Sequence, residues 1–234
     1  MALPLYLAMI AAEIMAISSP PANCAYMACH FSPYGNGLSN CPGELPPDTM
    51  LILNDRIPIH GHSPERIESQ LLELHSKLHF HSLLLDFQRP GCAETAILSS
   101  HLVKALPLPV GVSDMYAQGL DCPVFLSAPS PDIPLARYLQ PWNDREIWLE
   151  AALGGVEITL TETGATTIPC SPEEVTEASH SDPTLHCHYQ IDTEDSLARF
   201  TIFRTREDLN ALLKEAEDLG VTQAIGLYQQ LFDP

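Results

Sequence analysis

Two carboxylates in the sequence could work together in acid–base chemistry. Asp86 and Glu150 each lie at or near the end of a short apolar run. When two carboxyl groups share a site, the one in the more apolar setting holds a raised pKa and acts as the acid, while the other stays ionised. Gln88 lies two residues beyond Asp86, so an extended chain points both side chains the same way. The sequence predicts Asp86 and Glu150 as catalytic residues, with Gln88 beside them.

Polar side chains that follow other apolar runs extend this candidate site. If the runs are parallel strands of one barrel, their carboxyl ends meet at one mouth, where such folds place their active sites. Ser32, Asn54 and Asp114 stand at such ends. Taken one at a time, such a residue more often caps a loop than binds a ligand. The predicted ligand-binding residues are His30, Asp55, Gln88, Ser113 and Tyr228.

Three histidine pairs have the spacing H-x-H, which points both imidazoles one way on a strand and occurs in metal-dependent hydrolases. The pair at residues 79–81 comes just before a strand, at the structural end of a barrel, and the pair at 186–188 falls in an insertion. His60 and His62 follow a strand and are the candidate metal ligands. No carboxylate with matching spacing accompanies them. We expect no metal and no other cofactor.

Short apolar runs of strand length must position these residues. Most are apolar at both odd and even positions, which is typical of strands buried on both faces and favours a parallel sheet. The predicted strands are Leu5–Met9, Ala25–Phe31, Met50–Leu53, Leu83–Phe87, Val110–Val112, Val124–Leu126, Ile147–Leu153, His186–Ile191, Phe200–Phe203 and Ala224–Tyr228.

Amphipathic segments with helix-capping residues separate several of these runs. Helices are predicted over 63–78, 94–106 and 205–219, because Ser63 and Thr205 are good N-caps and Pro64 fits the first helical position. Alternating strands and helices imply parallel strands joined by crossovers, and their number favours closure into a (β/α)8 TIM-like barrel. A doubly wound open sheet is the alternative, but no nucleotide-binding glycine motif follows any strand.

The segment from Gly154 to Phe203 interrupts the alternation. It contains a threonine-rich alternating stretch over 156–167 and an acidic stretch over 173–182. This pattern predicts a small antiparallel insertion with an acidic loop, before the last helix and strand. Residues 1–234 are expected to form a single barrel-like domain that carries residues 154–203 as the insertion.

The segment Ser82–Gln88, S-L-L-L-D-F-Q, resembles the fourth strand of the chitinase-type glycoside hydrolases. That family carries the motif D-x-D-x-E on a (β/α)8 barrel and has a small α+β insertion before its final helix and strand. Asp86 and Gln88 fall on the last D-x-E of the motif, and Leu84 stands where the family has its first aspartate.

The resemblance implies an altered chemistry. The family's glutamate is the general acid that protonates the leaving sugar oxygen, and Gln88 has no proton to give. The resemblance therefore implies a barrel that lacks the usual general acid and binds a carbohydrate or similar polar ligand at its mouth. The alternative is that Leu83–Gln88 is only a buried strand that ends in polar residues.

Composition indicates which classes of partner are disfavoured and which cellular compartment to expect. The formal net charge of −19 repels nucleic acid and anionic membrane surfaces. The seven cysteines contain no C-x-x-C pair, and the apolar stretch Met1–Ile17 has no preceding Lys or Arg and includes Glu13, unlike a signal peptide. No apolar stretch is long enough to span a membrane. We expect a cytoplasmic protein with reduced thiols.

Three functions remain open on these grounds. The first is the carbohydrate-binding barrel without the family's general acid. The second is a hydrolase that works through Asp86 and Glu150, or through a metal at His60 and His62. The third is a non-catalytic interaction protein whose acidic loop, Glu173 to Asp182, docks a basic partner.

Overall fold

The computed structural model describes residues 3–17, 21–35, 37–170, 175–194 and 197–232 of the 234-residue chain. Eight parallel strands form a closed barrel in the order β1-β14-β8-β7-β6-β5-β4-β2, and pairing of β1 with β2 closes the ring. This confirms the predicted TIM-like barrel. The barrel strands are β1 (Leu5–Met9), β2 (Cys24–Phe31), β4 (Met50–Asn54), β5 (Ser82–Asp86), β6 (Val110–Ser113), β7 (Val124–Leu126), β8 (Ile147–Ala151) and β14 (Val221–Leu227).

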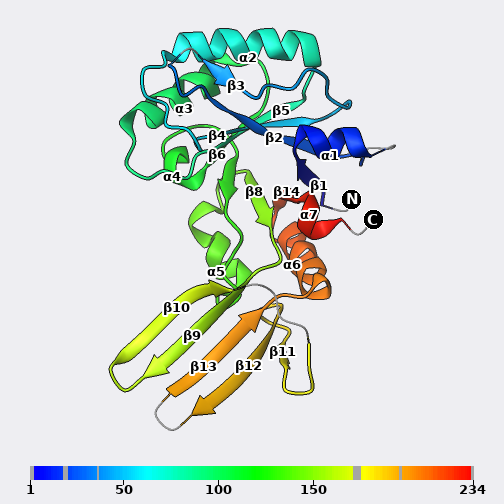
Figure 1. Ribbon diagram of the computed structural model, residues 1–234, viewed down its shortest axis with the longest axis vertical. Helices are drawn as coiled ribbons and strands as arrows, with labels where there is room; N and C mark the ends of the chain where they lie inside the picture. The colour runs from blue at the N-terminus through cyan, green and yellow to red at the C-terminus, as the bar shows by residue number, and fades with distance from the viewer. Residues whose placement is uncertain (1–2, 18–20, 36, 171–174, 195–196, 233–234) are drawn as a thin grey trace.

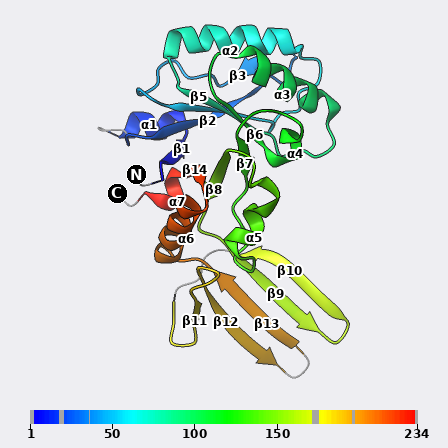
Figure 2. The same ribbon diagram turned by 180° about the vertical axis from the view of Figure 1, so that it is seen from behind.

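Helices of unequal length connect the barrel strands (Figures 1 and 2). The three long ones, α2, α3 and α6, are those that capping and periodicity predict. The others are one or two turns long. Their bounds are α1 (Ala11–Ala16), α2 (Pro64–Leu78), α3 (Ala93–Ala105), α4 (Asp114–Ala117), α5 (Leu135–Leu139), α6 (Arg206–Asp218) and α7 (Tyr228–Leu231), with a 3-10 turn over Gln140–Trp142.

The caps of α2 and α6 act as the sequence predicts. The Ser63 hydroxyl accepts a hydrogen bond from the backbone nitrogen of Arg66, and Pro64 takes the first helical position. The Thr205 hydroxyl accepts from the Asp208 nitrogen, and the Asp208 carboxylate accepts from the Thr205 nitrogen at 2.9 Å. These reciprocal bonds satisfy amides that the first turn leaves without partners, so they fix where each helix begins.

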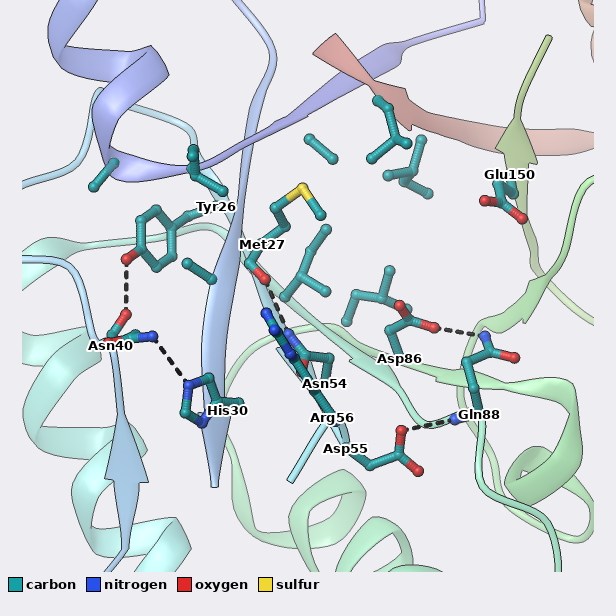
Figure 3. Close-up of a pocket in the computed structure, with 18 of the residues that line it drawn as sticks. Tyr26, Met27, His30, Asn40, Asn54, Asp55, Arg56, Asp86, Gln88 and Glu150 are labelled. Atoms are coloured by element: carbon teal, nitrogen blue, oxygen red, sulfur yellow. Dashed lines mark hydrogen bonds between the residues drawn. The ribbon is translucent and has the colours of Figure 1, made fainter. Parts of the chain in front are cut away.

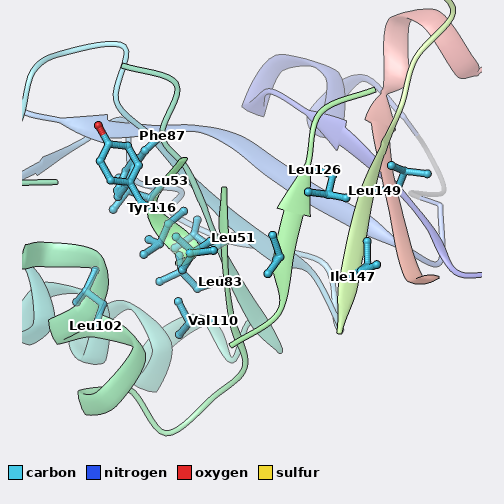
Figure 4. Close-up of a cluster of buried hydrophobic side chains, with 14 of the residues drawn as sticks. Leu51, Leu53, Leu83, Phe87, Leu102, Val110, Tyr116, Leu126, Ile147 and Leu149 are labelled. Carbon is cyan, nitrogen blue, oxygen red and sulfur yellow. The ribbon is translucent and has the colours of Figure 1, made fainter. Parts of the chain in front are cut away.

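Side chains on each barrel strand alternate between two buried regions. Outward-facing residues such as Leu51 and Leu83 pack against the helices, as Figure 4 shows for the cluster near α3 and α4. Inward-facing residues such as Ile52, Leu84 and Trp148 fill the barrel interior. Both faces of these strands are therefore buried, which explains their continuous apolar runs.

The predicted insertion is a second sheet, here called sheet B. Its five antiparallel strands follow the order β10-β9-β13-β12-β11 and extend away from the barrel on the side opposite α2 (Figures 1 and 2). The strands are β9 (Gly155–Thr161), β10 (Gly164–Cys170), β11 (His180–Asp182), β12 (Cys187–Glu194) and β13 (Leu197–Phe203). The antiparallel insertion before the last helix and strand is thus confirmed. Its assignment, with the barrel, to one domain over 1–234 stays a prediction.

A few boundaries differ from those expected. Strand β8 ends at Ala151 rather than Leu153, and β14 begins at Val221 and ends before Tyr228, which opens α7. A short strand that the sequence did not predict, β3 (Leu38–Ser39), pairs antiparallel with the end of β2. Residues 173 and 174 of the predicted acidic loop lie outside the described residues. No helix in the described ranges combines the length and apolarity needed to cross a membrane.

Candidate functional site

A cavity of about 840 Å3 opens at the carboxyl ends of the barrel strands. Its walls come from β1, β2, β4, β5, β7, β8 and β14, from the start of α1 and from the loops after β3, β4 and β5. Asp86 and Glu150 both line it, as do His30, Asp55 and Gln88 (Figure 3). The structure therefore brings together five of the seven residues that the sequence nominates for the site.

Asp86 and Gln88 form a direct contact on one wall. The Gln88 side-chain amide donates a hydrogen bond to Asp86 Oδ1 at 2.6 Å. Asp86 is inward-facing at the end of β5, two residues beyond the interior residue Leu84, and Gln88 follows just after the strand. The position that the resemblance assigns to a proton-donating glutamate is therefore filled by an amide that already points at the aspartate.

Asp55 holds the loop that carries Gln88. Its two carboxylate oxygens accept hydrogen bonds from the backbone nitrogens of Gln88 at 3.0 Å and Arg89 at 2.9 Å. The Arg89 side chain in turn donates to the backbone carbonyls of Asp55 and Arg56. Asp55 is only 5 % exposed, so these charge-assisted bonds form largely out of water. They fix the end of β4 against the end of β5.

Glu150 enters the cavity from β8, on the wall across from His30 and Asn40 (Figure 3). Its carboxylate accepts a hydrogen bond from the backbone nitrogen of Ala128 at 2.9 Å, which connects β8 to the loop after β7. In that loop the Ser127 carbonyl accepts from the Tyr138 hydroxyl at 2.8 Å. Burial, with the nearby charges of Asp114 and Glu150, raises the Tyr138 pKa to about 12.

Asp86 and Glu150 both have a raised pKa in the folded chain. Burial raises the pKa of Asp86; the Gln88 hydrogen bond partly offsets this, and the charge of Asp55 adds to the rise. Burial also raises the pKa of Glu150, which the Ala128 amide opposes and the charge of Asp86 reinforces. Loss of water disfavours each charge, and like charges disfavour each other. A carboxyl group with a raised pKa is suited to hold a proton or to bind a cationic or hydroxylated group.

The opposite wall depends on an irregularity in β2. Its pairing register with β4 shifts between Tyr26 and Cys29, and the Asn54 side-chain amide donates to the Met27 and Cys29 carbonyls, both at 3.0 Å. A bulge of this kind redirects the residues that follow it. Asn54 thus satisfies the carbonyls of the irregular segment just before His30.

His30 is held on two sides. Its Nδ1 lies 2.7 Å from the Phe31 carbonyl and its Nε2 lies 3.0 Å from the Asn40 amide nitrogen. A carbonyl can only accept, so the network assigns the ring proton to Nδ1 and leaves Nε2 as the acceptor. The Asn40 carbonyl also accepts from the Tyr26 hydroxyl at 2.7 Å. These bonds join the loop after β3 to β2, as Figure 3 shows.

Two nominated residues lie elsewhere. Ser113 is 1 % exposed, and its hydroxyl donates to the Phe87 carbonyl at 2.7 Å instead of lining the cavity. Tyr228 opens α7 and stacks on Phe232, with ring centroids 4.7 Å apart. Both residues stand at strand ends, as expected, but neither is among the residues around the cavity.

The candidate metal ligands have separate partners. His60 Nδ1 lies 2.9 Å from a carboxylate oxygen of Glu94, and both side chains are mostly exposed. His62 Nε2 lies 3.2 Å from the Ser32 carbonyl. Within the described ranges, no group of three histidine, cysteine or acidic side chains converges as a metal site. His186 and His188 pair with Glu215 and Asp208 of α6, so they join sheet B to the barrel.

Several cavity residues were not nominated as binding residues by the sequence. Asn40, Cys41 and Arg56 come from loops, and Phe125 comes from β7. Asn40 has a φ of 53°, in the left-handed region that asparagine tolerates better than most residues. Asparagine in a polar, glycine-containing stretch was the available signal for a turn, although it does not say which surface the turn faces.

Comparisons with known proteins show which solved structures share this fold. No protein-family model matches the chain, and no curated protein matches it in sequence. Solved structures match it in fold. The spore cortex-lytic enzyme SleL of Bacillus megaterium has a TM-score of 0.57 at 11 % identity, over 99 % of this chain and 71 % of the other.

Two further solved structures are similar to the same extent. A class V chitinase from Nicotiana tobaccum, a glutamate-to-glutamine mutant in complex with NAG4, gives a TM-score of 0.57 at 11 % identity, over 97 % and 93 % of the two chains. A chitinase-like agglutinin from Robinia pseudoacacia gives 0.55 at 12 % identity, over 94 % and 93 %. The resemblance to chitinase-type glycoside hydrolases is therefore confirmed at the level of the fold.

Proposed function

We propose that this chain, which has the fold of the chitinase-type glycoside hydrolases, binds a carbohydrate of the chito-oligosaccharide class without the family's hydrolysis. One observation carries the proposal: an amide, Gln88, contacts Asp86 at 2.6 Å in the cavity at the barrel mouth. An amide can hydrogen-bond a glycosidic oxygen but has no proton to release to a leaving group. The site can therefore hold a sugar while lacking the acid that would cleave it.

The lining of the cavity suits a sugar ring. Polar side chains approach from β2, β4, β5 and β8, while Tyr26, Met27 and Phe125 offer apolar faces. Carbohydrates present hydroxyl groups at their edges and C–H groups on their faces, so they favour convergent polar groups beside aromatic and apolar surfaces. About 840 Å3 accommodates an oligosaccharide segment rather than a single small ion.

Two of the fold relatives support binding without turnover. One is a glutamate-to-glutamine chitinase mutant that holds NAG4. The other is named a chitinase-like agglutinin. A barrel of this fold thus holds a sugar oligomer when a glutamine replaces a glutamate. This supports a carbohydrate ligand for a chain in which glutamine is the native residue at position 88.

Calorimetric titration with chitotetraose tests the proposal. The wild type should bind the oligosaccharide without releasing shorter products. Asp86→Ala should lower the affinity at least tenfold, because it removes both a ligand contact and the partner of Gln88. Asp121→Ala removes an exposed carboxylate before β7, away from the mouth, and should leave the affinity unchanged.

A gain of function makes the test sharper. Gln88→Glu restores a carboxyl group beside Asp86, whose charge would favour the protonated form that a general acid needs. We expect this variant to hydrolyse chitotetraose or a chromogenic analogue slowly, at a rate that the wild type does not reach. Absence of binding by the wild type to any N-acetylglucosamine oligomer would refute the proposal.

A second candidate function is hydrolysis through Asp86 and Glu150. The observation in its favour is that burial raises the pKa of both carboxyl groups, with a further rise from the charge of Asp55 at Asp86 and from the charge of Asp86 at Glu150. Turnover by the wild type that Glu150→Gln abolishes would establish this alternative.

A metal route through His60 and His62 requires that added zinc or manganese restore hydrolysis to a chelated sample. The acidic-loop interaction and the cytoplasmic location stay predictions.

A further inference from the structure

Sheet B has two chemically different faces. Cross-strand register places Val156, Ile158 and Leu160 of β9 beside Ile202, Phe200 and Ala198 of β13. Directly paired residues point to the same side of a sheet. The same register brings Tyr189 and Ile191 of β12 into this row. We call this side the apolar face and define it by Val156, Ile158, Leu160, Ile191, Phe200 and Ile202.

The other side of sheet B, here the polar face, carries the charges. Glu157, Arg199 and Asp192 alternate with the apolar-face residues along the same three strands. Arg199 pairs with Glu157 at 3.5 Å across β13 and β9. In a chain with a formal net charge of −19, the six defining residues of the apolar face contain no ionisable group. Charge depletion of this kind marks the centre of a protein–protein interface.

Other parts of the described chain contact sheet B on its polar face. At its base, His188 contacts Asp208 of α6 at 2.8 Å. On the same side, just before β11, the Ser179 hydroxyl accepts a hydrogen bond from the Gln190 amide at 2.9 Å. Gln190 and His188 both alternate with Tyr189 and Ile191, so they point to the polar face.

The apolar face has no comparable cover among the described residues. None of its six residues belongs to a buried core cluster or packs against one, and Leu160 and Ile191 are 40 % and 46 % exposed. Figures 1 and 2 show sheet B as a single layer with no helix lying over its strands. Because a sheet with an apolar face is stable when a second layer covers that face, the layer must come from outside the described part of the chain.

We propose that the apolar face is a dimer interface, in which sheet B of a second copy of this chain packs face to face on the first. Register places His180 and Asp182 of the edge strand β11 on this side too, beside Tyr189 and Cys187, whereas β9, β10, β12 and β13 carry no charged side chain on it. A second copy presents the same four-strand surface, so a two-fold axis can bring the two apolar faces together with the β11 edges outside the contact. The polar faces, with their acidic residues, then stay on the outside. This inference goes beyond the proposed carbohydrate binding and does not depend on it.

The size of the face agrees with a weak dimer. Four strands of about seven residues, β9, β10, β12 and β13, lie about 4.8 Å apart and rise about 3.4 Å per residue, which gives a footprint of roughly 450 Å2 per copy. Two copies then bury about 900 Å2 in total, in the range of weak, transient interfaces. Face-to-face packing about 10 Å apart would produce a β-sandwich between the subunits. Such an interface predicts a reversible dimer rather than an obligate one.

Sedimentation velocity of the full chain, over a range of protein concentrations, tests the proposal. The wild type should shift from monomer to dimer as concentration rises through the micromolar range. Ile191→Lys places a charge on the apolar face of each copy and should weaken dimerisation at least a hundredfold. The matched control is Asp192→Lys, which introduces the same side chain at the next residue but on the polar face, and it should still dimerise.

The sedimentation results can overturn the proposed dimer in two ways. A wild type that stays monomeric at 100-fold above the micromolar range, or that binds only a foreign protein, overturns the proposal. A dimer that persists in Ile191→Lys overturns it too, because the interface then lies elsewhere. If circular dichroism shows that Ile191→Lys does not fold, Leu160→Lys replaces it, since Leu160 lies on the same face and is already 40 % exposed. Chitotetraose binding is measured separately, so failure here leaves the proposed function intact.

Discussion

The barrel strands and the strands of sheet B both contain rows of apolar side chains, yet these side chains are buried to different extents. In the barrel, Leu51 and Leu83 are fully buried, because the interior packs against one face of each strand and the helices against the other. In sheet B, Leu160 and Ile191 stay well exposed, because a single layer has nothing to pack against. Burial therefore follows from the number of layers and not from the strand sequence alone.

This difference separates the roles of the two regions. The barrel contains most of the buried apolar surface, so it should supply most of the stability, and its rigid strand ends can hold a ligand site. Sheet B contributes little to the folded chain by itself and instead offers a surface for association. Substitutions that are chemically identical in the two regions should therefore have unequal effects.

The largest inequality is expected for leucine-to-alanine changes. Leu85→Ala in β5 removes a fully buried side chain and should lower the free energy of unfolding by about 3 kcal/mol, the sum of lost transfer energy and a cavity. Leu160→Ala in β9 removes a side chain that is 40 % exposed and should cost about 1 kcal/mol or less. Urea unfolding at low protein concentration measures both without a contribution from association. Equal losses would contradict the comparison.

A smaller inequality is expected for two glycines. A Cβ at Gly111 in β6 would lie 2.4 Å from the Trp148 ring, which is fully buried in the barrel and has no room to move. Gly111→Ala should therefore lower stability by about 2 kcal/mol through overpacking. At Gly154, just before β9, no atom lies within 4 Å of the place that a Cβ would take, so Gly154→Ala should be close to neutral.

Thermal melts of the two glycine variants give the measurement. A clear decrease in Tm is expected only for Gly111→Ala, because only that variant meets an immobile ring. If both variants melt together with the wild type, the barrel interior adapts more readily than its packing around Trp148 indicates.

The sequence predicted the regions in which a short-range pattern sets the structure. The barrel strands were recognisable because burial on both faces produces runs that are apolar at both parities, as in Met50–Leu53. The contact between Asp86 and Gln88 follows from the two-residue period of a strand. The caps at Ser63 and Thr205 also depend only on neighbours in the chain.

Features that depend on distant neighbours were not accessible in this way. The role of Asn54 requires the register shift in β2, which arises only when β2 and β4 pair. Ser113 stands at a strand end, but its hydroxyl turns to the Phe87 carbonyl, 26 residues away in the chain. The direction of Asn40 into the cavity depends on a left-handed turn that no periodicity encodes. Tertiary pairing, rather than local propensity, fixed each of these positions.

The smallest expected effect concerns the mouth of the barrel. It tests whether the buried charge of Glu150 lowers the stability of the fold there. Because burial raises the pKa of Glu150 in the folded chain above its ordinary 4.5, the folded state binds a proton more readily than the unfolded state. Wild-type stability should therefore fall as pH rises from about 4.5 through the higher folded pKa.

Glu150→Gln removes the cost of this buried charge and keeps an oxygen that can accept from Ala128. We expect it to raise stability at pH 7, and not at all below pH 4.5. Urea unfolding between pH 4 and pH 8 measures the difference, with Asp192→Asn on sheet B as the control, whose exposed carboxylate should make its effect small at every pH. A Glu150→Gln variant that is less stable than the wild type at pH 7 would mean that the charge at position 150 stabilises the fold, and that the mouth of the barrel is not under electrostatic strain.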